Sequence, residues 1–214
     1  MANSEMDGDR PIVVGIAGGT ASGKTTLARA LVAELDECLL LTHDRYYFTL
    51  PEAHQADPQK HNFDHPASLN TPRLVSDLGT LRQGRGTLVP RYDFTRHARC
   101  ADDEWVDVKP YIVIEGILVF ADQALRDCFD YLVYVTAPDD LRLSRRIRRD
   151  MAERGRSVDE VLQRWECTVR PMHHQFIEPS RRHAGLVVEG TVDLRVLLDD
   201  VLAFLSVIPR SKAP

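Results

Sequence analysis

Residues 12–26 read Ile-Val-Val-Gly-Ile-Ala-Gly-Gly-Thr-Ala-Ser-Gly-Lys-Thr-Thr, and this stretch decides the fold. The apolar run at 11–17 suits a strand that is buried on both faces of a parallel sheet. Residues 18–25 match the pattern G-x-x-x-x-G-K-[ST]. Small residues allow backbone N–H groups to surround phosphate oxygens, and a helix that opens near Lys24 adds its dipole. The stretch predicts a phosphate-binding loop between a strand and a helix.

The same loop predicts the cofactors. Lys24 can reach the β- and γ-phosphates of a nucleotide, and the Thr25 hydroxyl can ligate Mg²⁺. An accidental match is the alternative, and the strand and helix on either side of the loop disfavour it. We therefore expect ATP and Mg²⁺ as cofactors. The nucleotide-binding residues are expected to be Gly18, Gly19, Thr20, Ala21, Ser22, Gly23, Lys24 and Thr25.

Four more apolar runs follow, at 39–42, 111–114, 131–135 and 186–188. Helical segments alternate with them, and a closing helix is expected over 193–205. This order predicts an α/β fold with a doubly wound, five-stranded parallel sheet, whose ligands bind at the carboxyl ends of the strands. Residues 45–105 are less regular. They contain only strand-like pieces, near 87–89 and 105–108. Pro171 is expected to end or kink a helix that begins at Ser157.

The composition excludes several classes of protein. The 214 residues carry a net charge of −5, which argues against a protein that binds nucleic acids or anionic membranes in general. No run approaches the roughly 20 apolar residues of a membrane-spanning helix, and the polar start lacks the apolar segment of a signal peptide. The four cysteines are far apart and form no C-x-x-C pair, which favours reduced thiols and a cytoplasmic protein.

Two carboxylates follow predicted strands. Asp44 comes directly after the second strand, where it could accept a proton from an attacking hydroxyl or position Mg²⁺. Glu115 closes the third strand after four apolar residues, an arrangement suited to binding Mg²⁺. The alternatives are an aspartate that merely starts a loop and a glutamate in a solvated turn.

Seven arginines crowd residues 142–156, and several share a helix face through i, i+3 and i+7 spacing. In a kinase, such a segment is a lid whose guanidinium groups cover the phosphates and stabilise transition-state charge. A solvated face paired with nearby acids is the alternative. A nucleic-acid patch is disfavoured by the acidic chain and by the lack of interleaved aromatic residues.

Taken together, these residues resemble the uridine–cytidine kinases of pyrimidine salvage. The resemblance extends from about Ile12 to the closing helix. Its pieces are 18–26, Asp44-Arg45-Tyr46-Tyr47, Asn62-Phe63-Asp64-His65-Pro66, Tyr92-Asp93-Phe94 with His97, Glu115-Gly116-Ile117-Leu118, Arg145-Arg146 through Glu153-Arg154-Gly155-Arg156, Arg170-Pro171-Met172 and Phe176-Ile177-Glu178-Pro179-Ser180.

The resemblance implies a role for each matching residue. Asp44 matches the base that activates the ribose 5′-hydroxyl, Asp64 the acid that holds the ribose hydroxyls, and His97 a histidine near the 4-position of the pyrimidine. Thr26 extends the nucleotide-binding loop, and Thr25 and Glu115 match the Mg²⁺ ligands. Tyr47 and Tyr92 match aromatic residues of the nucleoside pocket. Arg146 and Arg156 match substrate arginines, and Lys24, Arg149 and Arg154 match catalytic cations.

The chain departs from the family pattern at two places. Arg164-Trp165 stands where the family usually has Gln-Tyr, and arginine supplies only donors where glutamine supplies both donors and acceptors. Val188-Glu189-Gly190-Thr191 stands where a Pro-Arg-Gly turn is common. The discrimination between uracil and cytosine, and between ATP and GTP, is therefore left open by the sequence.

The expected reaction is the phosphorylation of uridine and cytidine by ATP to give UMP and CMP. Two alternatives remain: a related kinase that acts on another small alcohol, such as ribulose phosphate or pantothenate, and a non-catalytic sensor of nucleoside triphosphates. The resemblance also implies a homotetramer. The expected organisation is a flexible leader (1–10), one kinase domain (11–208) and a tail (209–214). The domain would contain a nucleoside-binding insertion with a β-hairpin (45–108) and an arginine-rich lid (139–165).

Overall fold

The computed structural model describes residues 10–55 and 58–207. The expected leader therefore lies outside the described residues except for Arg10, and the expected tail lies outside them entirely.

The core of the molecule is a five-stranded parallel sheet in the order β2-β7-β1-β8-β9. This confirms the expected fold class. β1 occupies the centre, where Ile12 pairs with Tyr111 of β7 and Val14 pairs with Tyr131 of β8. The strands are β1 (Ile12–Gly18), β2 (Cys38–Thr42), β7 (Tyr111–Gly116), β8 (Tyr131–Thr136) and β9 (Leu186–Glu189).

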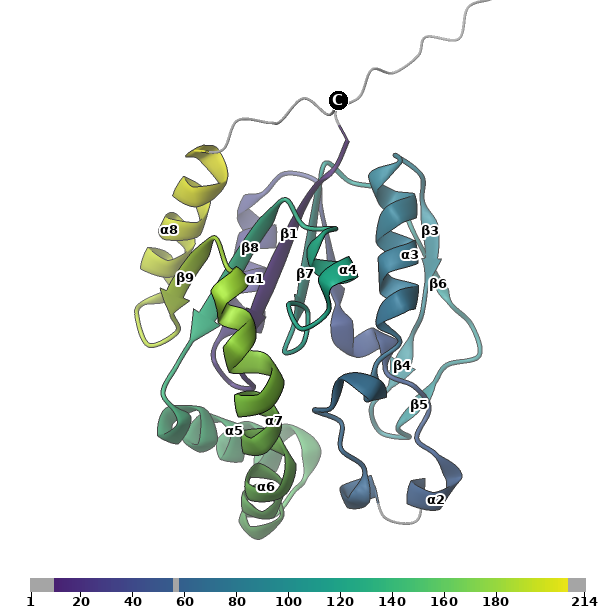
Figure 1. Ribbon diagram of the computed structural model, residues 1–214, viewed down its shortest axis with the longest axis vertical. Helices are drawn as coiled ribbons and strands as arrows, with labels where there is room; N and C mark the ends of the chain where they lie inside the picture. The colour runs from purple at the N-terminus through teal and green to yellow at the C-terminus, as the bar shows by residue number, and fades with distance from the viewer. Residues whose placement is uncertain (1–9, 56–57, 208–214) are drawn as a thin grey trace, which may run out of the picture.

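Helices cover both faces of this sheet (Figure 1). On one face, α1 (Lys24–Glu34) and α8 (Leu194–Val207) pack their leucines against buried valines of β7 and β8. On the other face, α3 (Thr71–Arg82) and α4 (Gln123–Arg126) complete a second hydrophobic core. Two buried faces explain why the strands are apolar along their whole length rather than alternating.

Helix α3 was not expected, because the segment 45–105 was interpreted as irregular. Leu74, Leu78 and Leu81 are fully buried along one face of α3. Asn70 caps the helix by accepting a hydrogen bond from the backbone N–H of Arg73. This stripe of three leucines is short and is interrupted by polar residues, so the sequence shows only a weak helical periodicity. The helix is stabilised mainly by packing against the sheet.

The rest of the segment 45–108 contains two antiparallel pairs of short strands. β3 (Thr87–Val89) pairs with β6 (Glu104–Val106), and β4 (Tyr92–Asp93) pairs with β5 (Ala98–Arg99) further out. The expected β-hairpin is therefore present. Four short helical pieces complete the segment: η1 (His43–Tyr46), α2 (Glu52–Gln55), η2 (Pro58–Lys60) and η3 (Pro66–Ser68).

The arginine-rich segment forms helices beyond the carboxyl end of β8, across from α2 and β4–β5 (Figure 1). α5 (Asp139–Arg154) ends at Gly155, and α6 (Val158–Arg164) begins after Ser157, which caps the N–H of Glu160. The chain then stays helical past Pro171, in a wider π form on both sides of it. The pieces are η4 (Trp165–Val169), α7 (Arg170–Met172), η5 (His173–Ile177) and η6 (Glu178–His183). Pro171 thus changes the hydrogen-bond register rather than ending the helix.

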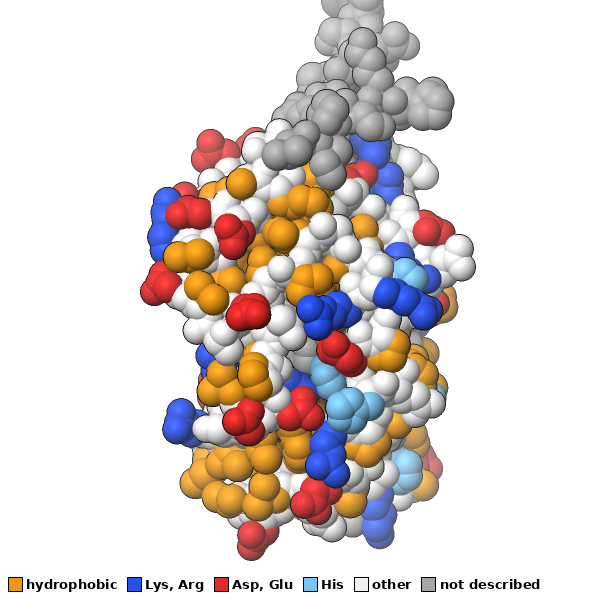
Figure 2. Space-filling view, turned by 60° about the vertical axis from the view of Figure 1, so that its left-hand side comes forward, with side chains coloured by type: hydrophobic (Ala, Val, Ile, Leu, Met, Phe, Trp, Pro, Cys, Tyr) orange, Lys and Arg blue, Asp and Glu red, His pale blue; other side chains and the backbone are white. Residues whose placement is uncertain are grey.

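Hydrophobic side chains reach the surface over α8 and over the arginine-rich helices, in patches broken by charged residues (Figure 2). Val187, Val192, Leu194 and Val196 are exposed around β9 and α8. Within residues 10–55 and 58–207, none of the helices combines the length and the hydropathy needed to cross a bilayer.

Candidate active site

The carboxyl ends of the strands open into a cleft of about 1200 Å³. The loop after β1 and the arginine-rich helices line one part of it, and residues of the segment 45–108 line another. The cleft brings together most of the side chains that the sequence singled out. These are Thr20, Ala21, Gly23, Lys24, Thr25, Thr26, Asp44, Tyr47, Asp64, Tyr92, His97, Glu115, Arg146, Arg149, Arg154 and Arg156.

The loop between β1 and α1 has the backbone of a phosphate cradle. Ala21 and Gly23 have φ values of 59° and 104°, in the left-handed region, and Gly23 is the N-cap of α1. Gly18, Gly19 and Ser22 are not among the lining residues of the cleft. A Cβ atom on Gly19 would lie 2.5 Å from Nη1 of the buried Arg142, so a larger residue would require the loop or the Arg142 side chain to shift. Gly18, Gly19 and Ser22 therefore contribute to the shape of the loop without lining the cleft.

Two side-chain oxygens that could ligate a metal lie beside the loop. The hydroxyl of Thr25 donates to Oε2 of Glu115 at 3.2 Å. Burial raises the pKa of Glu115, and the nearby Lys24 acts in the opposite direction. Within the described residues, no group of three or more His, Cys, Asp or Glu side chains could hold a metal. A hydroxyl and one carboxylate fit Mg²⁺, which usually keeps several waters and binds phosphate oxygens as well.

Asp44 lies in η1, immediately after β2. Its side chain is half-buried in the cleft, and burial raises its pKa, while Lys24, Arg154 and Arg149 act in the opposite direction. No ion pair joins Asp44 to a cation anywhere in the described part of the chain. The carboxylate is thus close to three cations but bound to none of them, which leaves its oxygens available to a hydroxyl group.

Aromatic rings form the wall beyond Asp44. The ring centroid of Tyr47 lies 5.6 Å from that of Tyr92 and 5.7 Å from that of Phe63, and the Tyr47 hydroxyl donates to the backbone oxygen of Phe63. The ring of His97 lies 5.0 Å from that of Phe63, at 32°. Burial and three nearby arginines lower the pKa of His97, which favours the neutral form of its ring. The wall can accept a flat, uncharged ring.

Asp64 and Arg146 lie between the aromatic wall and the phosphate loop. Asp64 is buried, which raises its pKa, and Arg146 opposes this shift. Nη1 of Arg146 donates to the hydroxyl of Thr20 in the loop at 3.0 Å. A buried carboxylate with such surroundings can accept hydrogen bonds from neutral hydroxyl groups.

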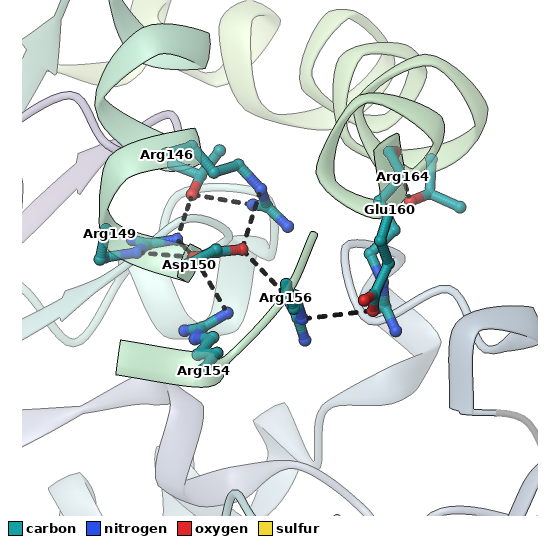
Figure 3. Close-up of polar contacts among 9 residues, drawn as sticks. Arg146, Arg149, Asp150, Arg154, Arg156, Glu160 and Arg164 are labelled. Carbon is teal, nitrogen blue, oxygen red and sulfur yellow. Dashed lines mark hydrogen bonds and ion pairs between the residues drawn. The ribbon is translucent and has the colours of Figure 1, made fainter. Parts of the chain in front are cut away.

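The arginines predicted to act in the lid converge on one acid. Asp150 of α5 contacts Arg146, Arg149, Arg154 and Arg156 (Figure 3). Sequence reasoning treated Asp150 only as a solvated partner of the arginines. Its spacing of four residues from both Arg146 and Arg154 was the available signal. Phe63 was named only as part of a motif, and its position between Tyr47 and His97 depends on the fold.

The two departures from the family pattern both lie in the cleft. Arg164 lines it with a side chain that is 11% exposed, and its Nε is 3.5 Å from Glu160. That Nε is buried and has no hydrogen-bond partner within the described residues. Gly190 packs against the phosphate loop, where a Cβ atom would lie 1.9 Å from the backbone oxygen of Ser22.

Comparison with known proteins places this chain in a family. Residues 13–196 match the model of the phosphoribulokinase/uridine kinase family. The chain is 41% identical over 201 residues to a uridine kinase from Ligilactobacillus salivarius, covering 93% of each protein. It is 40% identical over 195 residues to a uridine kinase from Chloroflexus aurantiacus, covering 90% of this chain and 93% of that protein.

Solved structures share the fold at low sequence identity. A protein from Bacillus stearothermophilus, described as a possible uridine kinase, has a TM-score of 0.62 at 18% identity, covering 86% of this chain and 91% of that one. Phosphoribulokinase from Rhodobacter spheroides has a TM-score of 0.62 at 12% identity, covering 85% of this chain and 71% of that one. The fold is therefore shared with proteins whose names refer to different substrates.

Proposed function

This chain belongs to the phosphoribulokinase/uridine kinase family, and we propose that it transfers the γ-phosphoryl group of ATP to the 5′-hydroxyl of uridine and of cytidine. Mg²⁺, held by Thr25, Glu115 and phosphate oxygens, would neutralise charge on the transferred group. One observation carries the proposal: the half-buried, unpaired carboxylate of Asp44 lies in the same cleft as Lys24 and the phosphate loop.

The proposed chemistry assigns separate tasks to the residues of this cleft. Asp44 accepts the proton of the attacking 5′-hydroxyl, so that the oxygen can attack the last phosphorus in line. Lys24, Arg149 and Arg154 stabilise the charge on the phosphoryl oxygens as the bond to the leaving phosphate breaks. The nucleotide binds along the loop that includes Gly18, Gly19, Thr20, Ala21, Ser22, Gly23 and Thr26. Catalysis in this scheme comes from positioning and charge neutralisation.

The nucleoside would bind on the side of the segment 45–108. Asp64 would hold the ribose hydroxyls, with Arg146 and Arg156 nearby, and the pyrimidine would lie against Tyr47 and Tyr92 with its 4-position toward His97. A neutral imidazole can present a donor or an acceptor, so it can serve both the O4 of uracil and the amino group of cytosine. We accordingly assign 45–108 as the nucleoside-binding insertion and 139–165 as the lid.

A panel of nucleosides and small alcohols, each assayed with ATP and Mg²⁺ for ADP formation, tests the proposal. ADP should form rapidly only when uridine or cytidine is present, and the product should be the 5′-monophosphate. Turnover with ribulose 5-phosphate or pantothenate instead would assign another substrate to the family fold. Nucleotide binding without turnover on any acceptor would favour a sensor.

A further inference from the structure

The carboxylate of Asp150 is completely buried in α5 and is surrounded by four guanidinium groups (Figure 3). Oδ1 accepts hydrogen bonds from Nε and Nη2 of Arg149 at 3.0 and 2.9 Å. Oδ2 accepts one from Nη1 of Arg156 at 2.8 Å. Arg146 and Arg154 lie further away, at 3.6 and 3.7 Å.

The charges in this cluster do not balance. Asp150 contacts four cations, and Glu160 contacts one of them, Arg156, so these six side chains together carry a net positive charge. Without Asp150, the guanidinium groups would repel one another at these separations. With it, they converge before any phosphate arrives, and the charge that remains is available to an anion.

The cluster also keeps its arginines away from Asp44. Arg149 and Arg154 lie close enough to Asp44 to interact with its charge, yet among the described residues both arginines form their ion pairs with Asp150. An arginine bound to Asp44 would occupy the oxygens that a substrate hydroxyl needs. It would also be turned away from the phosphates.

A second acid extends this arrangement toward the nucleoside side of the cleft. Nε of Arg156 lies 3.6 Å from Oε1 of Glu160, which lies 3.5 Å from Nε of Arg164 (Figure 3). Arg156 thus contacts Asp150 through one nitrogen and Glu160 through another. The orientation of Arg149 on the phosphate side and of Arg156 on the nucleoside side therefore depends on the same carboxylate.

We propose that Asp150 is a positioning residue of the reaction: it orients Arg149 and Arg156 and directs the lid arginines to the phosphates rather than to Asp44. The inference rests on the proposed function for the direction of phosphoryl transfer. Asp150 touches neither ATP nor the acceptor in this scheme. Removing its charge should therefore reduce the stabilisation of the transition state far more than it reduces the affinity for ATP.

The test is Asp150→Asn, which keeps the shape of the side chain and removes its charge. We expect kcat to fall on the order of 10- to 100-fold, the scale of a misplaced catalytic group. The KM for ATP should change less than about threefold, because losing a negative charge does not weaken the attraction of the lid for phosphates. Asp200→Asn is the matched control. Asp200 is an exposed acid of α8 that does not line the cleft and has no hydrogen bond or ion pair with any described residue, and its variant should keep kcat within about twofold.

The outcomes separate positioning from simple structural support. A kcat for Asp150→Asn within about threefold of the wild type would overturn the proposal. So would a parallel loss of kcat and ATP affinity in an Asp150→Asn variant that keeps the melting temperature of the wild type. All ratios are measured with the acceptor that the wild type phosphorylates best. If the wild type does not phosphorylate uridine or cytidine, the proposed function is contradicted. The role of Asp150 can still be tested with the acceptor that the wild type does phosphorylate.

A combined variant tests the proposal even if Asp150→Asn alone fails to fold. Arg149→Met and Arg156→Met together remove the two guanidinium groups that hydrogen-bond to Asp150, so Asp150→Asn in this background leaves fewer cations to repel one another. If Asp150 acts through Arg149 and Arg156, adding Asp150→Asn to these two substitutions should lower kcat by less than about threefold, since interacting positions are not additive. A further loss on the order of tenfold would overturn the proposal.

Discussion

The hydroxyl of Thr25 donates a hydrogen bond to Glu115 across 90 residues of sequence. This contact joins the first turn of α1 to the carboxyl end of β7, the strand that pairs with β1. Two residues that the sequence indicates on separate grounds, one from the phosphate loop and one from a strand end, are therefore neighbours. The contact gives the proposed metal site its two protein oxygens.

Replacing the charged ligand tests the metal site. We expect Glu115→Gln to raise the Mg²⁺ concentration needed for half-maximal activity by roughly 10- to 100-fold, because the amide lacks the charge that a hard cation favours. A Mg²⁺ titration of turnover measures this change, and chelation of the metal should stop turnover in the wild type. Glu166→Gln, at an exposed position of η4, is the control and should leave the titration unchanged.

The pH profile tests Asp44. Burial raises its pKa, and a general base works only when it is ionised. Activity should therefore fall as the pH drops through this raised pKa, at a higher pH than for an ordinary aspartate. Asp44→Asn should lower kcat by at least ~10²-fold while uridine still binds. Steady-state rates and calorimetry measure the two effects.

Asp102→Asn provides the control for Asp44, since Asp102 is exposed on the loop between β5 and β6. Its pH profile should coincide with that of the wild type. Near-normal turnover of Asp44→Asn would remove Asp44 from the role of base.

Arg164 should set the preference between the two pyrimidines. Its guanidinium offers only donors, which suit the carbonyl oxygens of uracil better than the amino group of cytosine. Arg164→Gln should therefore raise the ratio of kcat/KM for cytidine over uridine by roughly 3- to 10-fold, the worth of about one hydrogen bond. Parallel assays of the two nucleosides give the ratio. An unchanged ratio would mean that Arg164 does not contact the base.

Gly190 should be as important to the phosphate loop as the glycines within it. A Cβ atom there would lie 1.9 Å from the backbone oxygen of Ser22. Gly190→Ala should therefore displace the loop, raise the KM for ATP several-fold and lower the melting temperature by several degrees.

Gly79→Ala is the matched control for Gly190→Ala. A Cβ atom on Gly79 meets nothing within 4 Å, and Gly79 lies inside helix α3. Alanine should stabilise that helix by about 0.5–1 kcal/mol and leave the KM for ATP unchanged. A Gly190→Ala variant that behaved like Gly79→Ala would show that the loop tolerates displacement.

The sequence predicted the sheet well, because residues buried on both faces leave uninterrupted apolar runs. β1, β7 and β8 were each recognisable from such a run. Helix α3 was missed because its three buried leucines become informative only once the sheet supplies the opposite surface. Of the two expectations for Pro171, that it ends the helix was wrong, since a wider helical turn accommodates the missing N–H group.

The sequence predicted that Lys24 and Thr25 lie in one site, because both belong to a single motif with a defined chemistry. The grouping of Tyr47 and His97 around Phe63 was not predicted, because it depends on three segments that meet only in the fold. Asp150 had the right spacing to pair with arginines. Its complete burial, which distinguishes it from an acid on a solvated face, could not be read from the sequence.

The topology of the sheet has a consequence for how the protein is made. β1 leads into the nucleotide cradle, yet both of its neighbours, β7 and β8, are encoded far downstream. A nascent chain on the ribosome therefore exposes a strongly apolar strand until Thr136 has been synthesised and has emerged. Long-range parallel pairing of this kind forms slowly and favours aggregation in the meantime. The strand that leads into the nucleotide cradle is therefore translated before both of its neighbours and is paired on both edges only after β8 has emerged.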